Sequence, residues 1–416
     1  MSPDVTEAWI IDGCRTPRGI GKVGKGGLAG LHPQVLGATV LRALADRNGL
    51  DTGDVDDIVW GTFMQVGTQG GDLGRMAALD AGYAITASGV TLDRFCGSGI
   101  SAVNFAAASI MSGMEDVVVA GGTEMMSSYA SNVSASRSPF LDSGNDHLRT
   151  IHPQTNQGLA ADAIATLEKI DRRSVDELAA ESQRRAEVAI KEGRFDRSLV
   201  PVHNLDGSLA LDREEFPRPG TTADSLASLP PSFEALADIP LDENGTTYRS
   251  LVLQKFPGLE ITHVHHAGNS SGVVDGAAAL LLTSPEYAST HGMTPRARIV
   301  ATANVGDDPT LMLNAPVPAA QKVLAKAGLS LNDIDLFEVN EAFAVVPEKF
   351  IRDTGIDREK INVNGGAIAL GHPIGATGSL LVGTALDELE RRDAQFALIT
   401  MCAGGGMAPA VIIERI

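Results

Sequence analysis

The chain has 416 residues, enough for two or three domains, and a formal net charge of −19 at pH 7. The charge argues against nucleic acid or an anionic membrane as a partner, because its long-range field repels both. No apolar run reaches the roughly 18 residues of a membrane span, and the acidic first residues lack the basic start and apolar core of a secretion signal, so we expect a cytoplasmic protein.

The first part of the chain opens with a strand at 8–11, a helix at 32–47 and a second strand at 58–62, each indicated by its apolar spacing. A G-x-G-x-x-G pattern at 19–24 lies between the first two elements. It is separated from the strand by a proline-bearing turn and is not followed directly by a helix, so it lacks the context of a dinucleotide loop. We interpret it as a Lys-bearing surface loop.

Residues 90–126 place a cysteine where a strand turns into a helix. A β-branched run is followed by Cys96 and a Gly-Ser-Gly turn, after which apolar residues recur at helical spacing. A buried parallel strand at 117–120 follows and ends at Gly121-Gly122. Unpaired N–H groups and the positive end of the helix dipole favour the thiolate form of Cys96, which makes it a candidate nucleophile. The alternative is a small buried hydrophobe, the usual fate of a free cysteine.

The middle of the chain is polar and rich in turns. The stretch 127–157 is too long for a simple connection, which indicates a functional excursion. An amphipathic helix is predicted at 174–192, with its first residue and Glu177 forming a capping box. The acidic stretch 236–250 matches no element, and a strand is predicted at 278–283.

The last third repeats the plan of the first. Residues 363–410 run from a strand through glycine-rich turns to a helix and a buried strand, as residues 90–122 do. One unit presents Cys96, and the other presents His372 and Cys402. Two similar α/β units that face each other would bring these side chains together at their shared seam.

A cysteine nucleophile requires a base within hydrogen-bond reach, and a second acid or base if a proton on carbon also moves. His372, between glycines, is a candidate for the first group, and Cys402 for the second. Asn340 and Glu341 add a polar pair after a strand predicted at 336–339.

Five short motifs follow one another along the chain: Cys96-Gly-Ser-Gly, Asn340-Glu341-Ala-Phe, Asn364-Gly-Gly-Ala, Gly371-His372-Pro and Cys402-Ala-Gly404-Gly-Gly. In this order they resemble the thiolase family, the acyl-CoA:acetyl-CoA C-acyltransferases. The resemblance begins at the Arg15-Thr16-Pro17 turn and covers nearly the whole chain. Because several independent motifs agree, we interpret Cys96 as catalytic rather than structural.

The resemblance implies an α/β thiolase-like fold. Two similar βαβαβ-type halves would pack face to face in five layers, with an inserted loop domain. The boundaries we expect are 1–126 for the N-terminal half, with 255–275 returning to it, 127–254 for the loop and CoA-binding excursion, and 276–416 for the C-terminal half.

The resemblance also implies a role for each site residue. Cys96 would become acylated, His372 would take its proton, and Cys402 would be the acid/base at the methyl carbon of acetyl-CoA. Asn340 would hold a water that forms one oxyanion hole with His372. The N–H groups of Cys96 and Gly404 would form the other, because each developing oxyanion needs donors fixed beforehand.

For coenzyme A itself, Arg218, Ser225 and Ser271 match positions of the family. An Arg in a Pro-Gly loop could otherwise be solvated surface. Coenzyme A and acyl-CoA would be substrates, with no permanently bound cofactor, and the family implies a homodimer or homotetramer.

No metal site is expected. The three cysteines lack disulfide or metal-knuckle spacing, which favours a reducing compartment. His263, His265 and His266 cluster, but alternate residues of a strand point opposite ways and the family needs no metal.

The chain departs from many biosynthetic thiolases at positions that bear on the acyl group. Asn156-Gln157-Gly158 replaces His-Met-Gly, Leu313-Asn314-Ala315-Pro316 falls where those enzymes have Met-Gly-x-Gly-Pro, His266 replaces a usual Thr, and 236–250 looks inserted. We therefore expect a wider or more polar acyl pocket, and 3-ketoacyl-CoA substrates longer than acetoacetyl-CoA in a degradative enzyme.

Three other functions make different demands on these residues or on the direction of the reaction. A biosynthetic acetoacetyl-CoA thiolase would use the same residues in the opposite direction. A decarboxylating condensing enzyme of the same fold would have a second His or Asn in place of Cys402. A catalytically inactive CoA-binding scaffold would be expected to lack Cys96, His372 or Cys402, and all three are present.

Overall fold

The computed structural model describes residues 6–129 and 138–416. Within them, the strands form one ten-stranded sheet and a separate hairpin of β6 (Val202–His203) and β7 (Leu209–Leu211). None of the described helices is long and apolar enough to cross a membrane.

The first half of the large sheet combines N-terminal strands with one strand from much later in the chain. β8 is antiparallel to both β1 and β5, whereas β3 is parallel to β5 and to the edge strand β4. The short β2 also pairs with β8. The bounds are β1 (Trp9–Arg15), β2 (Gly19–Ile20), β3 (Asp57–Gly61), β4 (Val90–Leu92), β5 (Val117–Met125) and β8 (Val274–Thr283).

The second half repeats this order and these directions. β12 is antiparallel to β9 and β11, and β11 is parallel to β10. Where the first half has β4, a single parallel bridge joins Phe337 to Ile361, so the strand expected from Val363 does not form. The bounds are β9 (Ala297–Gly306), β10 (Leu336–Val339), β11 (Phe396–Thr400) and β12 (Met407–Arg415).

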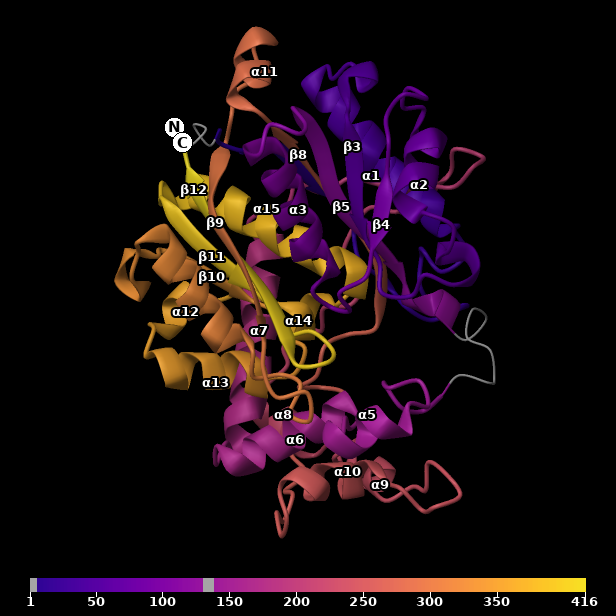
Figure 1. Ribbon diagram of the computed structural model, residues 1–416, viewed down its shortest axis with the longest axis vertical. Coiled ribbons are helices and arrows are strands. Elements are labelled where there is room, and N and C mark those ends of the chain that lie inside the picture. The colour runs from indigo at the N-terminus through magenta and orange to yellow at the C-terminus, as the bar shows by residue number, and fades with distance from the viewer. Residues whose placement is uncertain (1–5, 130–137) are drawn as a thin grey trace.

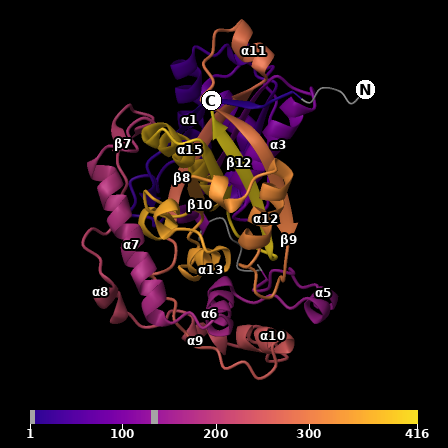
Figure 2. The same cartoon turned by 90° about the vertical axis from the view of Figure 1, so that its left-hand side faces the viewer.

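The helices complete five layers, as expected. α3 (Ser98–Met111) and α15 (Ile374–Arg392) pack on each other between the two half-sheets (Figure 1). α1 (Pro33–Asn48) and α2 (Leu73–Ala81) cover the outer face of the first half. α12 (Pro316–Ala327) covers that of the second, with α13 (Val345–Thr354) beside it (Figure 2). The prediction of two similar halves packed face to face is therefore confirmed.

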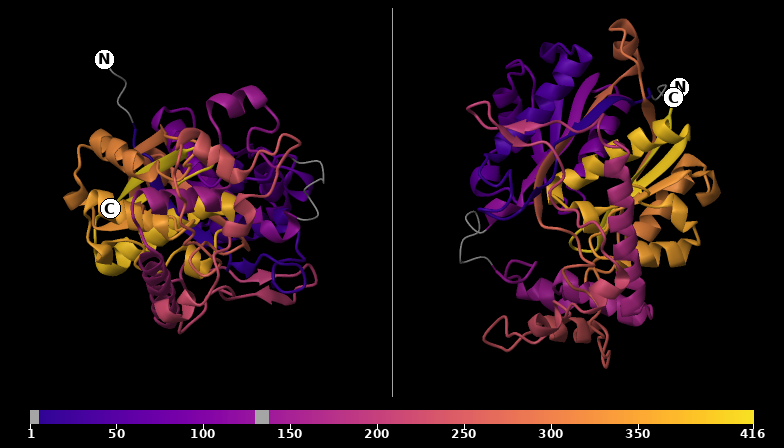
Figure 3. Two further views of the ribbon diagram at one scale, coloured as in Figure 1. Left: turned by 90° about the horizontal axis from the view of Figure 1, so that it is seen from below. Right: turned by 180° about the vertical axis from the view of Figure 1, so that it is seen from behind.

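The inserted region lies at one end of both halves (Figure 3). Its helices add apolar residues to the core of the second half, since Leu159 and Ile164 share one buried cluster with Phe337 and Phe343. Val202 and Leu211 of the β6–β7 hairpin belong instead to the buried cluster of the first half. Its helices are α5 (Asp146–Ile151), α6 (Gln157–Leu167), α7 (Arg172–Lys191), α8 (Ala223–Ala227), α9 (Glu234–Ala237) and α10 (Tyr248–Lys255). Two short helices lie elsewhere, α11 (Pro285–Thr290) and α14 (Ala367–Leu370).

Several local expectations differ from the structure. β5 runs past Gly121-Gly122 to Met125, because the antiparallel partner β8 continues beside it. α7 begins two residues before Ser174, and the Asp171 carboxylate accepts a hydrogen bond from the Ser174 N–H at 2.8 Å. The capping box predicted at Ser174 and Glu177 is therefore wrong.

Near residues 255 and 276, the places where the chain passes from one half of the fold to the other differ from the expected domain boundaries. β8 spans residue 276 and pairs with strands of the first half. Before β8, the segment 256–273 contacts the inserted region and the second half, where the Ser271 N–H donates to the Ala342 carbonyl at 2.9 Å. The acidic stretch 236–250 contributes the end of α9 and the start of α10.

The two central helices meet backbone to backbone. A Cβ added to Gly378 of α15 would lie 2.0 Å from the Ile100 nitrogen, and one added to Gly99 of α3 would lie 2.7 Å from the Ser379 nitrogen. Only glycine permits this approach. Because Cys96 and His372 immediately precede the two helices, the contact brings the two turns to the same seam.

This close approach predicts the effect of a single methyl group. Gly378→Ala should lower the free energy of unfolding by about 1–3 kcal/mol, because backbone atoms of α3 must move to make room. Gly383→Ala in the same helix is the control, since no described atom lies within 4 Å of its added Cβ. It should be neutral or stabilising, because alanine favours a helix over glycine. Equal melting temperatures for the two variants would contradict the proposed packing constraint.

Candidate active site

Cys96 lies in a tight turn between β4 and α3. Phe95 has a positive φ of 50°, and Gly97 is the N-cap of α3. The Ser98 hydroxyl fixes this turn, accepting from the Arg94 N–H at 2.9 Å and donating to the Phe95 carbonyl at 2.6 Å. The Cys96 side chain is half-buried and faces a cavity.

The thiol of Cys96 is protonated at rest. Burial raises its pKa to about 12, and the nearby Glu124 carboxylate raises it further. The direction is opposite to that expected from the helix terminus, because desolvation of the sulfur disfavours its charged form. Cys96 needs a base to become a nucleophile.

Glu124 of β5 is a buried carboxylate that pattern analysis missed. It accepts from the Phe63 N–H, the Gly375 N–H and the Gln69 amide, each at 2.8 Å. It thus ties the loop after β3 to the start of α15, and burial raises its pKa. A single acidic residue inside a fully buried strand was the signal that could have found it.

His372 is positioned as a neutral base. Its Nδ1 lies 2.6 Å from the Thr377 hydroxyl, which itself donates to the Pro373 carbonyl at 3.0 Å. Because a hydroxyl has one proton, Thr377 accepts from Nδ1–H and leaves the Nε2 lone pair free. Burial lowers the pKa of His372 to about 4, so the ring is neutral at pH 7. Thr377 lies one turn along the helix and carries no sequence signal of its own.

Asn340 stands beside this base at the end of β10. Its amide Nδ2 lies 3.5 Å from His372 Nε2, and its buried Oδ1 has no hydrogen-bond partner. An unpaired buried acceptor fits a water or a substrate donor. The neighbouring Glu341 is structural, because its carboxylate accepts from the Ser182 hydroxyl at 2.6 Å and from the Ile368 N–H at 3.1 Å.

Cys402 and Gly404 lie in the turn between β11 and β12. Burial raises the pKa of Cys402 above its ordinary value, and the Cys96 thiol adds to the effect, so the two sulfur atoms lie within electrostatic reach. A Cβ on Gly404 would meet the Phe95 ring at 2.9 Å, which places this glycine against the Cys96 turn. Neither the Cys96 N–H nor the Gly404 N–H has a backbone carbonyl partner in the described part of the chain.

Cys96 and Gly404 open into a cavity of about 180 Å³. Aromatic and aliphatic side chains line it together with amides, a thiol and two hydroxyls. The lining residues are Phe63, Phe95, Cys96, Pro139, Leu141, Gln154, Thr155, Asn156, Gln157, Tyr248, Met312, Ile374 and Gly404. A larger cavity of about 700 Å³ lies elsewhere and is not a candidate site, since its buried Arg296 is already paired with Asp12, Asp387 and Glu390.

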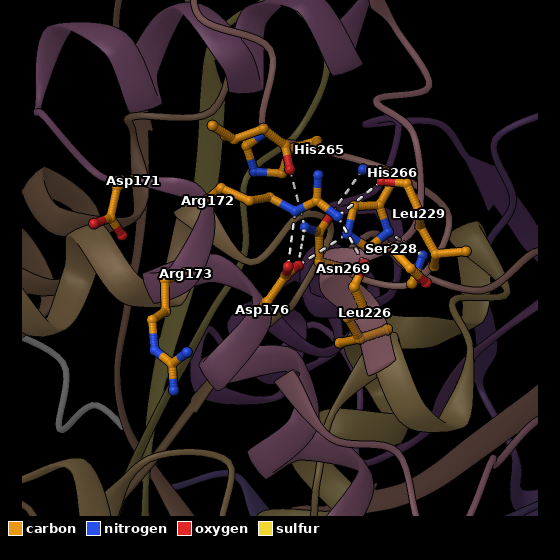
Figure 4. Close-up of polar contacts among 12 residues, drawn as sticks. Asp171, Arg172, Arg173, Asp176, Leu226, Ser228, Leu229, His265, His266 and Asn269 are labelled. Atoms are coloured by element: carbon orange, nitrogen blue, oxygen red, sulfur yellow. Dashed lines mark hydrogen bonds and ion pairs between the residues drawn. The ribbon is translucent and has the colours of Figure 1, made fainter. Parts of the chain in front are cut away.

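The residues expected to contact coenzyme A do not line this cavity. Arg218 and Ser225 are exposed, and Ser271 is half-buried. Ser225 lies in α8, where its side chain and that of Thr222 cap each other's N–H groups. Arg172 of α7 holds the end of this helix by donating to the Leu226 carbonyl at 2.7 Å (Figure 4).

The three histidines bind buried carboxylates. The Nδ1 atoms of His263 and His265 each lie 2.7 Å from Asp162, so the two rings converge on one partner although alternate positions were expected to diverge. The segment is not a strand, which explains the difference. His266 shares Asp176 with Arg172 and with Asn269 (Figure 4). The described residues hold no cluster of three or more His, Cys, Asp or Glu that could bind a metal ion.

The arrangement provides a half-buried thiol, a neutral imidazole with a free nitrogen, a second buried thiol and an unpaired amide oxygen. A thiol and a base support acyl transfer, and a second acid/base supports a proton transfer at carbon.

Comparisons with known proteins identify relatives that are named as acyl-transferring enzymes. The family models of the thiolase N-terminal and C-terminal domains match residues 8–238 and 293–415. The steroid 3-ketoacyl-CoA thiolase of Mycobacterium tuberculosis is 38% identical over 99% of this chain and 95% of its own. The beta-ketoadipyl-CoA thiolase of Escherichia coli is 40% identical over 99% of this chain and 100% of its own. The crystal structure of the Bacillus anthracis acetyl-CoA acetyltransferase superposes over the full length of both chains, with a TM-score of 0.83 and 33% identity.

Because both family models match and relatives of about 40% identity cover it from end to end, the chain belongs to the thiolase family and is an acyltransferase.

Proposed function

We propose that this thiolase works in the degradative direction, cleaving a 3-ketoacyl-CoA with coenzyme A to acetyl-CoA and a shortened acyl-CoA. The observation that carries the proposed direction is the cavity of about 180 Å³ beside Cys96, which is larger than an acetyl group requires. The fixed tautomer of His372, whose Nε2 can accept the proton of a neutral thiol, supports acyl transfer in either direction.

Cleavage begins at Cys96. His372 Nε2 takes the thiol proton, and the sulfur attacks the C3 carbonyl of the 3-ketoacyl-CoA. When the tetrahedral intermediate collapses, the C2–C3 bond breaks, its electron pair stays on C2, and the acyl group remains on sulfur. Cys402, whose raised pKa keeps it protonated, donates its proton to C2 and releases acetyl-CoA.

The second half of the cycle returns the enzyme to its starting state. The Cys402 thiolate takes the proton of the incoming coenzyme A thiol, and the CoA sulfur attacks the acyl-enzyme carbonyl. Cys96 leaves and regains its proton from His372. The atoms and protons then balance over one turnover.

Two sets of donors stabilise the oxyanions. The unpaired Oδ1 of Asn340 supports a bound water that, with His372, donates to one oxyanion. The N–H groups of Cys96 and Gly404, on either side of the Phe95 ring, serve the acyl-enzyme carbonyl. Arg218, Ser225 and Ser271 are proposed to contact coenzyme A.

The cavity favours degradation over acetoacetyl-CoA synthesis, because an acetyl group on Cys96 would leave most of about 180 Å³ unfilled. Each methylene buried there contributes roughly 0.8 kcal/mol until the space is full. Acyl chains longer than that of acetoacetyl-CoA are therefore preferred, and no permanently bound cofactor or metal is required. The three free cysteines suit the reducing cytoplasm.

A homodimer or a dimer of dimers is the proposed assembly. β4 forms the open edge of the sheet, and it exposes Val90 (44%) beside the half-exposed Phe105 (46%) of α3. An open edge with exposed apolar side chains suits pairing with a second copy.

The acyl group should be found on Cys96. Incubation with a 3-ketoacyl-CoA, followed by peptide mass mapping, should add the acyl mass to the Cys96 peptide. Cys96→Ala should remove both the adduct and turnover, whereas Cys14→Ala, at a buried cysteine outside the site, should keep both. An adduct found on Cys402 alone would refute the assignment of the nucleophile.

Because the pKa of His372 is lowered in the folded state, we expect the free energy of unfolding to depend on pH. The unfolded ring titrates near 6.5 and the folded ring near 4, so between these values the unfolded state binds more protons and stability falls as pH falls. From pH 7 to pH 5 the wild type should lose about 2 kcal/mol relative to His372→Gln. Urea unfolding at both pH values measures the difference. Parallel losses in the two proteins would mean that His372 is not held neutral.

The oligomer is tested by light scattering at micromolar concentration. We expect a mass of at least twice the 43.4 kDa chain, and Val90→Lys at the sheet edge should lower it by placing like charges across a two-fold contact. A wild-type mass equal to one chain would contradict the proposed assembly.

A further inference from the structure

The cavity beside Cys96 has aromatic walls. Phe63 and Phe95 lie with their ring centroids 5.7 Å apart, and Tyr248 also faces the cavity. An acyl group transferred to Cys96 would lie against these rings. Ring-to-ring contacts add stabilisation beyond the apolar area they bury.

Tyr248 comes from α10, which begins within the inserted acidic stretch. Its hydroxyl donates to the Pro139 carbonyl at 3.3 Å, and its own carbonyl accepts from the Thr155 hydroxyl at 2.8 Å. Both partners also line the cavity, so the insertion is fastened to the acyl pocket. Tyr248 is therefore held in place by these hydrogen bonds as part of the cavity wall.

The described lining carries no charged side chain. Its polar groups are the hydroxyls of Thr155 and Tyr248, the Cys96 thiol and the amides of Gln154, Asn156 and Gln157. The nearby Arg149 is not free to bind an anion, because Asp142 accepts from two of its nitrogens, each at 2.8 Å. Among the described residues of this lining, a carboxylate at the end of an acyl chain would find no cationic partner, and burying it unpaired is costly.

The size of the cavity limits the acyl group. An apolar cavity of about 150 Å³ holds one benzene molecule, and the cavity here measures about 180 Å³. It therefore accommodates a single ring or a chain of about six carbons.

We infer that the preferred substrate is a 3-ketoacyl-CoA whose acyl group is compact, uncharged and ring-bearing, with Tyr248 as a specificity-determining residue. The inference rests on the proposed function and narrows its substrate class. It sets this chain apart from the relative named for beta-ketoadipyl-CoA, whose acyl group ends in a carboxylate.

A substrate panel tests the inference by thiolysis with the full-length enzyme. 3-Oxohexanoyl-CoA and 3-oxoadipyl-CoA have the same carbon chain and differ by a terminal carboxylate. We expect kcat/KM to be at least about 100-fold higher for the neutral one. Benzoylacetyl-CoA, which carries a phenyl ring, should exceed acetoacetyl-CoA and 3-oxododecanoyl-CoA, which are too small and too long for the cavity.

Two variants test the lining itself. Gln157→Arg brings a cation to the cavity and should reduce the preference for 3-oxohexanoyl-CoA over 3-oxoadipyl-CoA by at least about tenfold. Tyr248→Leu should reduce the kcat/KM ratio of benzoylacetyl-CoA to 3-oxohexanoyl-CoA roughly fivefold. Tyr287→Leu, in the first turn of the distant α11, is the matched control and should leave both ratios unchanged.

The outcomes separate the two proposals. No thiolysis of any substrate, acetoacetyl-CoA included, by folded enzyme would overturn the proposed function and this inference with it. Two results would overturn the substrate class alone. One is a kcat/KM for 3-oxoadipyl-CoA within tenfold of that for 3-oxohexanoyl-CoA. The other is a kcat/KM that is highest for acetoacetyl-CoA or for 3-oxododecanoyl-CoA. An unchanged ratio in Tyr248→Leu would exclude Tyr248 as a specificity determinant.

Discussion

The contact between α3 and α15 is the constraint on which the site depends. Gly99 and Gly378 let the two helices touch through their backbones, so the turns that precede them, which carry Cys96 and His372, meet at one seam. The sheet could not hold this alignment by itself, because β1 and β9 join the half-sheets through only two residue pairs. Glu124 reinforces the alignment by binding the N–H of Gly375 at the start of α15.

Burial determines the charges in this seam. Desolvation raises the pKa of Cys96 and lowers that of His372, so both groups are neutral at rest. A neutral thiol and a neutral imidazole can be buried together at less cost than an ion pair. In the proposed mechanism, charge develops only when a substrate carbonyl receives the sulfur, and the N–H groups of Cys96 and Gly404 would stabilise it.

Local sequence patterns predicted the architecture well. The repeated order of glycine-rich turn, helix and strand corresponds to the two half-sheets, because turn chemistry and apolar spacing are local properties. The strand expected from Val363 is the exception, since a single bridge at Ile361 takes its place. Tertiary effects were not predictable in this way. Glu124 contacts residues distant in sequence, and Thr377 has a role only because the fold turns its hydroxyl toward His372. Desolvation raises the pKa of Cys96, the opposite of the shift expected from the helix terminus. The start of α7 was misplaced because Asp171 and Ser174 are both good N-caps, and only the fold selects one.

The raised pKa of Cys96 also bears on how the protein survives oxidants. Peroxides and alkylating agents react with thiolates far faster than with thiols, so a cysteine that ionises only while a substrate is being attacked is inert between turnovers. A lowered pKa would have made the same cysteine a target for sulfenic acid formation.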